Sequence, residues 1–115
     1  MATEIGHRVA DLADRIASEG KTSYADRLRS ESLSISGILA AGSAYPTKLE
    51  FSEFVGRARA ATLELANLII FFAERELLSE AEEAELVNML KRESKMLDNF
   101  RQSLERAERP EAAVV

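Results

Sequence analysis

Proline occurs at only two positions in this 115-residue chain, Pro46 and Pro110, and their rarity is the strongest guide to the fold. Proline breaks the interior of a helix, so residues 1–45 and 47–109 are both free to form long helices. Within them, apolar residues recur at spacings of three and four, as on one face of an amphipathic helix. The chain is also rich in Ala, Leu, Glu, Arg and Ser. The sequence therefore predicts an all-α fold.

Residues that end or begin helices divide these two stretches into four segments. The signals are terminating glycines at Gly20 and Gly42, a cap at Thr22 or Ser23, and capping boxes at Thr47 with Glu50 and Ser79 with Glu82. The helices are expected at about residues 4–19, 24–41, 48–78 and 80–108. Short loops between amphipathic helices favour an up-down-up-down antiparallel four-helix bundle. We expect one domain over residues 1–109 and a flexible C-terminal tail over 110–115.

The third predicted helix carries two apolar stripes on opposite sides. A heptad repeat that starts at Phe51 places one stripe in the core, and it runs from Phe51 to Phe72. The opposite position of the repeat should be the most exposed, yet it is also mostly apolar. Its residues are Leu49, Gly56, Leu63, Ile70 and Leu77, and Phe71 widens the stripe. Because large apolar side chains lose about 1.5 to 3 kcal/mol each when left in water, this stripe predicts self-association.

A complementary surface is expected on the second helix. Its outward side carries the small residues Ser34 and Gly37, flanked by Ile38, and small residues let another helix approach closely. Contact between two different surfaces is heterologous and closes into a ring when the rotation permits. The alternative is that the apolar stripe packs across one shoulder of its own bundle.

Composition restricts the compartment and the partners. The chain has no cysteine, no apolar run near the roughly 20 residues that span a bilayer, and no secretory leader at its start. We therefore expect a cytoplasmic protein without a membrane partner. The net charge of −5 disfavours nucleic acid at long range.

The sequence offers no arrangement typical of catalysis. His7 is the only histidine, so a paired-histidine metal site is not available and a catalytic triad would have to use His7, which we expect on the surface of the first helix beside Arg8. Acidic residues crowd positions 74–85, where they suit the positive start of the last helix better than a cation site. Basic residues on the outer side of that helix, from Lys91 to Arg109, are interrupted by Glu105 and Glu108. We expect a protein that is not an enzyme and has no cofactor.

Three segments from Arg27 to Leu104 resemble a known family. RLRSESLSISGILAAGS (27–43) is similar to the family segment QLRRAAVSIPSNIAEGS. EFSEFVGRARAATLEL (50–65) resembles its EF-x-x-FL-x-x-A-x-GS-x-x-EL, and ERELLSEAE with SKMLDNFRQSL resembles its closing helix. The family is that of the 23S rRNA intervening sequence protein, to which the accessory variability determinant of diversity-generating retroelements is related.

The resemblance implies a homopentamer of four-helix bundles arranged around a channel. Most members have no established activity, whereas the retroelement relative is a basic partner of a reverse transcriptase and of nucleic acid. The matching basic positions here are Arg29 and Arg59. The leading hypothesis is a homo-oligomeric scaffold or adaptor whose further protein partner the sequence does not identify. The rival hypothesis is a nucleic-acid-binding accessory protein.

Overall fold

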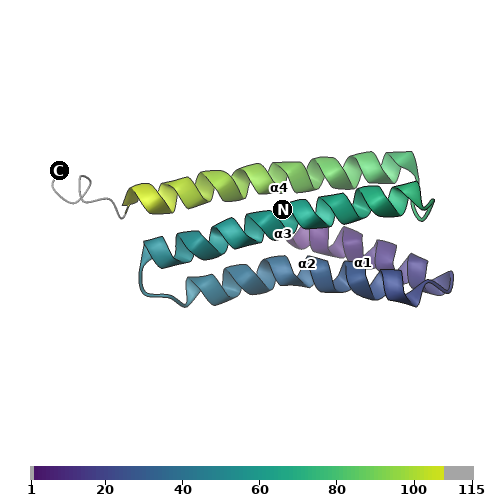
Figure 1. Cartoon of the computed structure of the whole chain (residues 1–115), viewed down its shortest axis with the longest axis horizontal. Coiled ribbons are helices and arrows are strands. Elements are labelled where there is room, and N and C mark those ends of the chain that lie inside the picture. The colour runs from purple at the N-terminus through teal and green to yellow at the C-terminus, as the bar shows by residue number, and fades with distance from the viewer. Residues whose placement is uncertain (1, 108–115) are drawn as a thin grey trace.

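The computed structural model describes residues 2–107, and side chains from Glu4 onward. Its helices are α1 (Ala2–Ser18), α2 (Thr22–Ser43), α3 (Lys48–Glu74) and α4 (Glu80–Ala107). Consecutive helices run antiparallel to one another (Figure 1). The predicted all-α architecture of four helices is confirmed for the described part of the chain. The expected tail at 110–115 lies outside the described residues.

The two longest helices begin at the predicted capping residues, with both hydrogen bonds of a capping box at Ser79 and the forward one at Thr47. The backbone N–H of Glu50 donates to Thr47 Oγ1 at 3.1 Å, and the N–H of Glu82 donates to Ser79 Oγ at 3.1 Å. Glu82 returns the contact, because its Oε1 accepts from the Ser79 N–H at 2.9 Å. Each pair satisfies backbone donors that the first helical turn leaves without a partner.

The turn from α1 to α2 depends on Gly20. Its φ of +84° is unfavourable for side-chain-bearing residues, and it lets the Lys21 N–H reach back to the Ile16 carbonyl at 3.2 Å. The predicted cap by Thr22 or Ser23 is wrong. Thr22 is the first residue of α2, and the capping position, Lys21, makes no side-chain hydrogen bond to the helix.

The end of α3 differs from the prediction. The helix ends at Glu74 and not near Leu78, because Glu76 adopts a φ of +62° and the Leu77 N–H donates to the Phe72 carbonyl at 3.0 Å. This reversal turns Leu77 and Leu78 into the core, where they are 8% and 7% exposed. Leu77 was predicted to belong to the outward stripe of the third helix, and that prediction is wrong because its side chain lies in the core.

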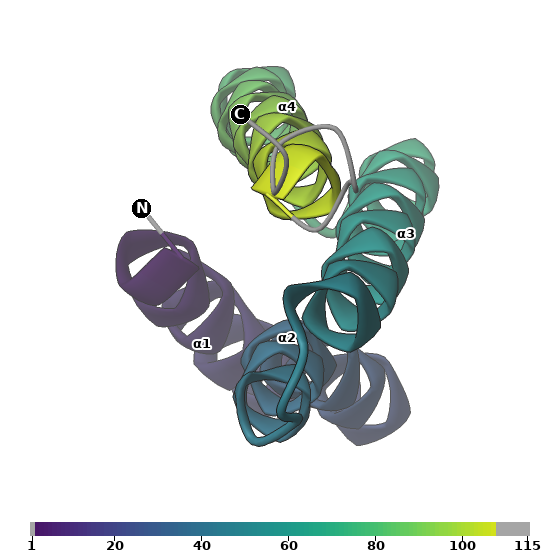
Figure 2. The same cartoon turned by 90° about the vertical axis from the view of Figure 1, so that its left-hand side faces the viewer.

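The helices do not surround the core evenly. Viewed along the bundle, α3 lies between α2 and α4, while α1 packs on α2 and lies apart from α4 along much of its length (Figure 2). The core includes Val9 and Ile16 of α1, Leu28 of α2, Leu65 of α3 and Leu90 of α4, all of them fully buried. The predicted core faces of the four helices therefore do meet.

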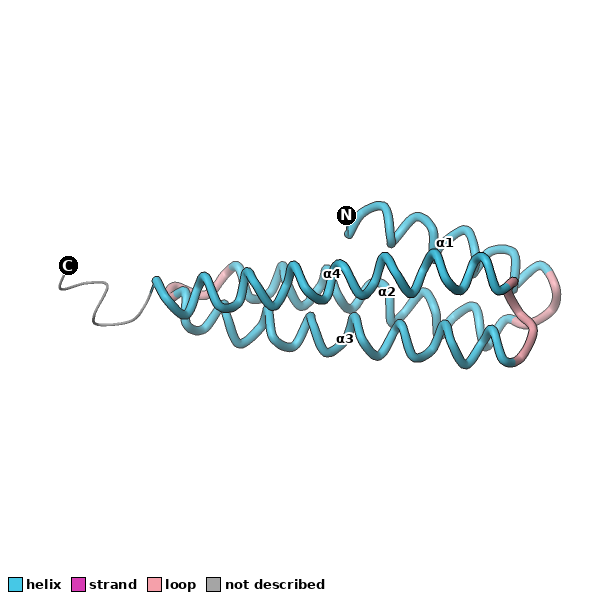
Figure 3. Tube along the Cα trace, turned by 90° about the horizontal axis from the view of Figure 1, so that it is seen from above, coloured by secondary structure: helices cyan, strands magenta, loops and turns pink. Residues whose placement is uncertain are grey.

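The first helix is too short to cover the whole of α4. It has 17 residues against 28 in α4, and its N-terminal end lies about halfway along α4 (Figure 3). Residues seven apart share one helix face, so Met96 continues the face of Met89, and Phe100 continues that of Glu93. Met89 and Glu93 are buried, whereas Met96 and Phe100 are 52% and 41% exposed. Burial of this face of α4 therefore stops near the level of the N-terminal end of α1.

Candidate interaction surfaces

The outward side of α3 is apolar and uncovered in the described chain. Leu49, Leu63, Ile70 and Phe71, here called the α3 outer face, are between 37% and 53% exposed. Gly56 is half-buried, since the aliphatic part of Arg101 lies beside it. A shallow hollow between α2 and α3 adjoins Leu63 and Phe71. The alternative that the predicted stripe packs within its own bundle does not hold for these four residues.

The surface expected on α2 is only partly open. A Cβ added at Gly37 would meet no atom within 4 Å, so this part of the helix is accessible to another chain. Ser34 is half-buried and donates to the Glu31 carbonyl at 3.0 Å. Ile38 is also half-buried and packs against the core. Within the predicted set, Gly37 therefore has the most accessible position on α2.

The two arginines carried over from the family do not form a basic patch. Arg29 bonds Asp14 at 2.8 Å and Asp26 at 3.2 Å, so its charge is opposed by two carboxylates. The hydrogen bond to Asp14 raises the pKa of Arg29. Arg59 is half-buried, and its Nε has no hydrogen-bond partner in the described part of the chain. The sequence alone identified the two cations, but it did not predict that Asp14 and Asp26 would pair with Arg29.

Basic side chains gather instead on the outward side of α4. Arg101 holds Asp98 at 2.7 Å and Glu105 at 2.8 Å, which lowers the pKa of Asp98. Of the two acidic residues expected to interrupt the basic series, Glu105 is thus already engaged, and Glu108 lies outside the described residues. Across residues 2–107, no ion pair is formed by the exposed cations Lys91, Arg92, Lys95 and Arg106.

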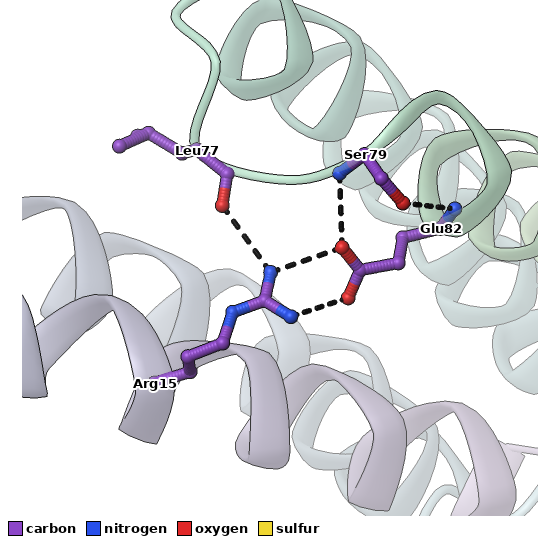
Figure 4. Close-up of polar contacts among 4 residues, drawn as sticks. All are labelled: Arg15, Leu77, Ser79 and Glu82. Carbon is purple, nitrogen blue, oxygen red and sulfur yellow. Dashed lines mark hydrogen bonds and ion pairs between the residues drawn. The ribbon is translucent and has the colours of Figure 1, made fainter.

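A polar cluster fastens α1 to the turn between α3 and α4 (Figure 4). Arg15 donates from Nη1 to Glu82 Oε2 at 2.6 Å, and from Nη2 to Glu82 Oε1 at 3.1 Å and to the Leu77 carbonyl at 3.3 Å. The hydrogen bond from Arg15 is the main cause of a lowered pKa at Glu82 and of a raised pKa at Arg15 itself. Further along α1, Arg8 pairs with Glu85 of α4. These contacts across long sequence separations were not predicted.

The acidic residues near the α3–α4 turn do not assemble into a cation site. Among the residues that the structure describes, no group of three or more His, Asp or Glu side chains could hold a metal ion. One acid is unusual for another reason. Glu93 is 6% exposed, and its Oε2 has no hydrogen-bond partner within residues 2–107. Burial raises the pKa of this carboxyl group.

Comparisons with known proteins identify one family. The family model described as 23S rRNA-intervening sequence protein matches residues 1–99, so the match includes α1 as well as the segments from Arg27 onward. No curated protein and no solved structure matches the chain. None of the helices in the described range is long and apolar enough to cross a membrane.

Proposed function

Because the chain belongs to the 23S rRNA-intervening sequence protein family, we propose that it is a non-enzymatic homo-oligomeric scaffold whose copies meet through the α3 outer face. One observation carries the proposal. Leu63, Ile70 and Phe71 are each more than one third exposed, and they lie within about three helical turns of one another, so they form one continuous apolar patch. An apolar patch of this kind on a small helical domain is typical of a protein interface.

The number of copies follows from the family resemblance, which implies a ring of five. The α3 outer face occurs once in each copy and differs from the other surfaces of the molecule. If it contacts a different surface on its neighbour, each copy uses two surfaces and the assembly is cyclic. The scaffold would act in the cytoplasm, which the absence of cysteine supports.

Light scattering at micromolar concentration tests the assembly. The wild-type protein should have a mass several times the 12.7 kDa of one chain. Ile70→Glu should reduce the mass to that of one chain with unchanged helical content, because Ile70 lies outside the core and a carboxylate there cannot be buried without a partner. Asn88→Glu adds the same charge at an exposed position of α4 and should remain assembled. A wild-type monomer at this concentration refutes the proposal.

The second candidate is a nucleic-acid-binding accessory protein, and it is favoured by the α4 cations that form no ion pair within the described residues. Lys91 and Lys95 are four residues apart on an exposed helix surface, a spacing that suits contacts to successive phosphates. Salt-dependent binding of RNA or DNA should then be weakened by Lys91→Glu with Lys95→Glu. Arg29→Glu should have a smaller effect, because Arg29 is already opposed by Asp14 and Asp26. Undetectable binding at low salt removes this candidate.

A further inference from the structure

The uncovered half of α4 has the shape of a helix-binding site that residues 2–107 do not fill. Met96 and Phe100 lie one heptad after Met89 and Glu93, which are buried in the half of the bundle that contains α1. Phe100 is held in place by an edge-to-face contact with Phe51 of α3, with 5.4 Å between the ring centres. The exposed apolar surface is therefore preorganised, and what it lacks is a helix in the place where a longer α1 would lie.

Two cations border this uncovered face. Arg92 precedes Met96 by four residues, so the two side chains are neighbours on the helix surface. Arg106 follows Arg92 by fourteen residues, which places it on the same side of α4 two heptads later. Both side chains are exposed, and within the described residues neither has an ion-pair partner. The site therefore has an apolar centre and a basic border.

The α3 outer face has the opposite border. Glu64 is adjacent to Leu63, and Glu74 follows Ile70 by four residues. Both glutamates are exposed, and within residues 2–107 no cation pairs with either. This surface therefore combines an apolar centre with acidic residues, and it belongs to a helix long enough to occupy the uncovered position.

We propose that the α3 outer face of a second copy docks on the uncovered half of α4, with Leu63, Ile70 and Phe71 against Met96 and Phe100. Glu64 and Glu74 of that copy lie near Arg92 and Arg106. The fourteen residues between the arginines span about 21 Å of helix and the ten between the glutamates about 15 Å, a difference that two long side chains can bridge. The inference rests on the proposed assembly and names the surface that receives the α3 outer face.

A charge exchange tests this contact in the full-length protein. Arg92→Glu with Arg106→Glu, or Glu64→Lys with Glu74→Lys, places like charges opposite each other and should raise the concentration of half-assembly about tenfold or more. One chain carrying all four substitutions restores opposite charges at every contact and keeps the net charge of −5, so its assembly should recover. Lys21→Glu with Ala10→Glu and Thr22→Glu is the control, because it changes net charge as much as the arginine pair does but lies at exposed positions of α1, α2 and the turn between them.

Sedimentation separates the outcomes. If the wild-type protein assembles and the fourfold variant remains dissociated, the pairing is overturned while the scaffold proposal stands. The same conclusion follows if both paired variants assemble normally. If the wild-type protein is a monomer, the scaffold proposal fails first. If Arg92→Glu with Arg106→Glu leaves assembly unchanged but abolishes binding to an RNA oligonucleotide, the cations serve nucleic acid and the docking is wrong.

A second variant tests the apolar part independently of charge pairs. Met96 is more than half exposed, so Met96→Glu should fold with unchanged helical content and yet dissociate the assembly. Gln102→Glu adds the same charge at an exposed position of α4 about 120° around the helix from Met96 and should weaken assembly less. Equal assembly of Met96→Glu and the wild-type protein overturns the proposed contact.

Discussion

Gly42 sets the distance between α2 and α3. The sequence suggested that it ends the second helix, but α2 continues to Ser43 and Gly42 is buried inside the last turn. A Cβ at this position would overlap the Cβ of Phe54 and would lie 2.9 Å from its Cγ and 3.0 Å from Cδ1 of Phe51. The first overlap cannot be relieved by rotating the Phe54 ring, because a Cβ moves only with its backbone. The glycine is therefore required for close helix packing.

Gly42→Ala should lower the free energy of unfolding by about 1–3 kcal/mol through this overlap. Gly37→Ala, five residues earlier in the same helix, meets open space and should raise it by about 0.5–1 kcal/mol, since alanine favours helix more than glycine does. Both changes are measured by urea unfolding of proteins that also carry Ile70→Glu, so that assembly does not contribute to the free energy of unfolding. A Gly42→Ala variant that gains stability like Gly37→Ala contradicts the packing argument.

Glu93 makes stability depend on pH in the direction opposite to an ion-paired acid. Its raised pKa means that the folded chain binds the proton more tightly than the unfolded chain does. The contribution of Glu93 to stability should therefore be greatest below the ordinary glutamate value of 4.5 and should fall as pH rises through the folded value. The carboxyl group is buried, and its Oε2 has no hydrogen-bond partner among residues 2–107.

Glu93→Gln should thus raise stability at pH 7 by roughly 1 kcal/mol, because it removes an ionisable group whose charged form burial disfavours and keeps the size of the side chain. The gain should shrink as pH falls toward 4, where the wild-type group is neutral as well. Thermal unfolding at a series of pH values measures the difference. A gain of the same size at pH 4 and pH 7 would show that the charge is not responsible.

The helix α1 depends on long-range polar contacts at its C-terminal end. It packs on α2 along its length but meets α4 mainly near the α3–α4 turn, where Arg15 joins Glu82 and the Leu77 carbonyl. Both charged side chains are more than one third exposed, so solvent screening keeps the contribution of the pair to overall stability small. Its main effect is to hold the end of one helix against the turn of another.

Arg15→Met should therefore speed amide hydrogen exchange in the last turn of α1 with little change in overall unfolding. Because the pKa of Glu82 is lowered in the folded protein, the pair stabilises above the ordinary glutamate value and is lost as pH falls through the folded value. The difference between variant and wild type should disappear in that acidic range. Arg27→Met, which breaks only a pair within α2, is the matched control and should leave α1 unchanged.

The whole molecule has two unlike halves. Near the α3–α4 turn four helices enclose the core, whereas at the other end α2, α3 and α4 remain without α1 (Figures 1 and 3). The exposed apolar residues at that end include Met96 and Phe100, and the α3 outer face adds a second surface. A neighbouring copy that covers both surfaces would complete the burial that one chain leaves unfinished.

If assembly completes this burial, the midpoint of thermal unfolding should rise with protein concentration, because association stabilises the folded chain by mass action. Ile70→Glu should remove the dependence and melt at a constant, lower temperature. Calorimetry over a hundredfold range of concentration provides the measurement. A wild-type midpoint that does not vary over that range argues against assembly.

Local sequence signals predicted the helices and their capping residues well, but they predicted poorly which side chains contact one another between helices. The boxes at Thr47 and Ser79 were readable because a cap joins residues only three apart. The left-handed turn at Glu76 carries no such signal, since a glutamate adopts it only where packing of Leu77 and Leu78 favours the reversal. Likewise, Arg29 could be recognised as a cation, but Asp14, fifteen residues away, becomes its partner only after α1 and α2 pack.

Helix content, helix order and the apolar faces were thus decided by interactions between residues a few positions apart, and the sequence alone determines these interactions. Which part of each face is buried was decided only in three dimensions. Phe100 lies on the same face of α4 as the buried Glu93, yet it remains 41% exposed because the N-terminal end of α1 reaches only about halfway along α4. Burial needs a second surface at contact distance, and that distance depends on the lengths and packing of all four helices together.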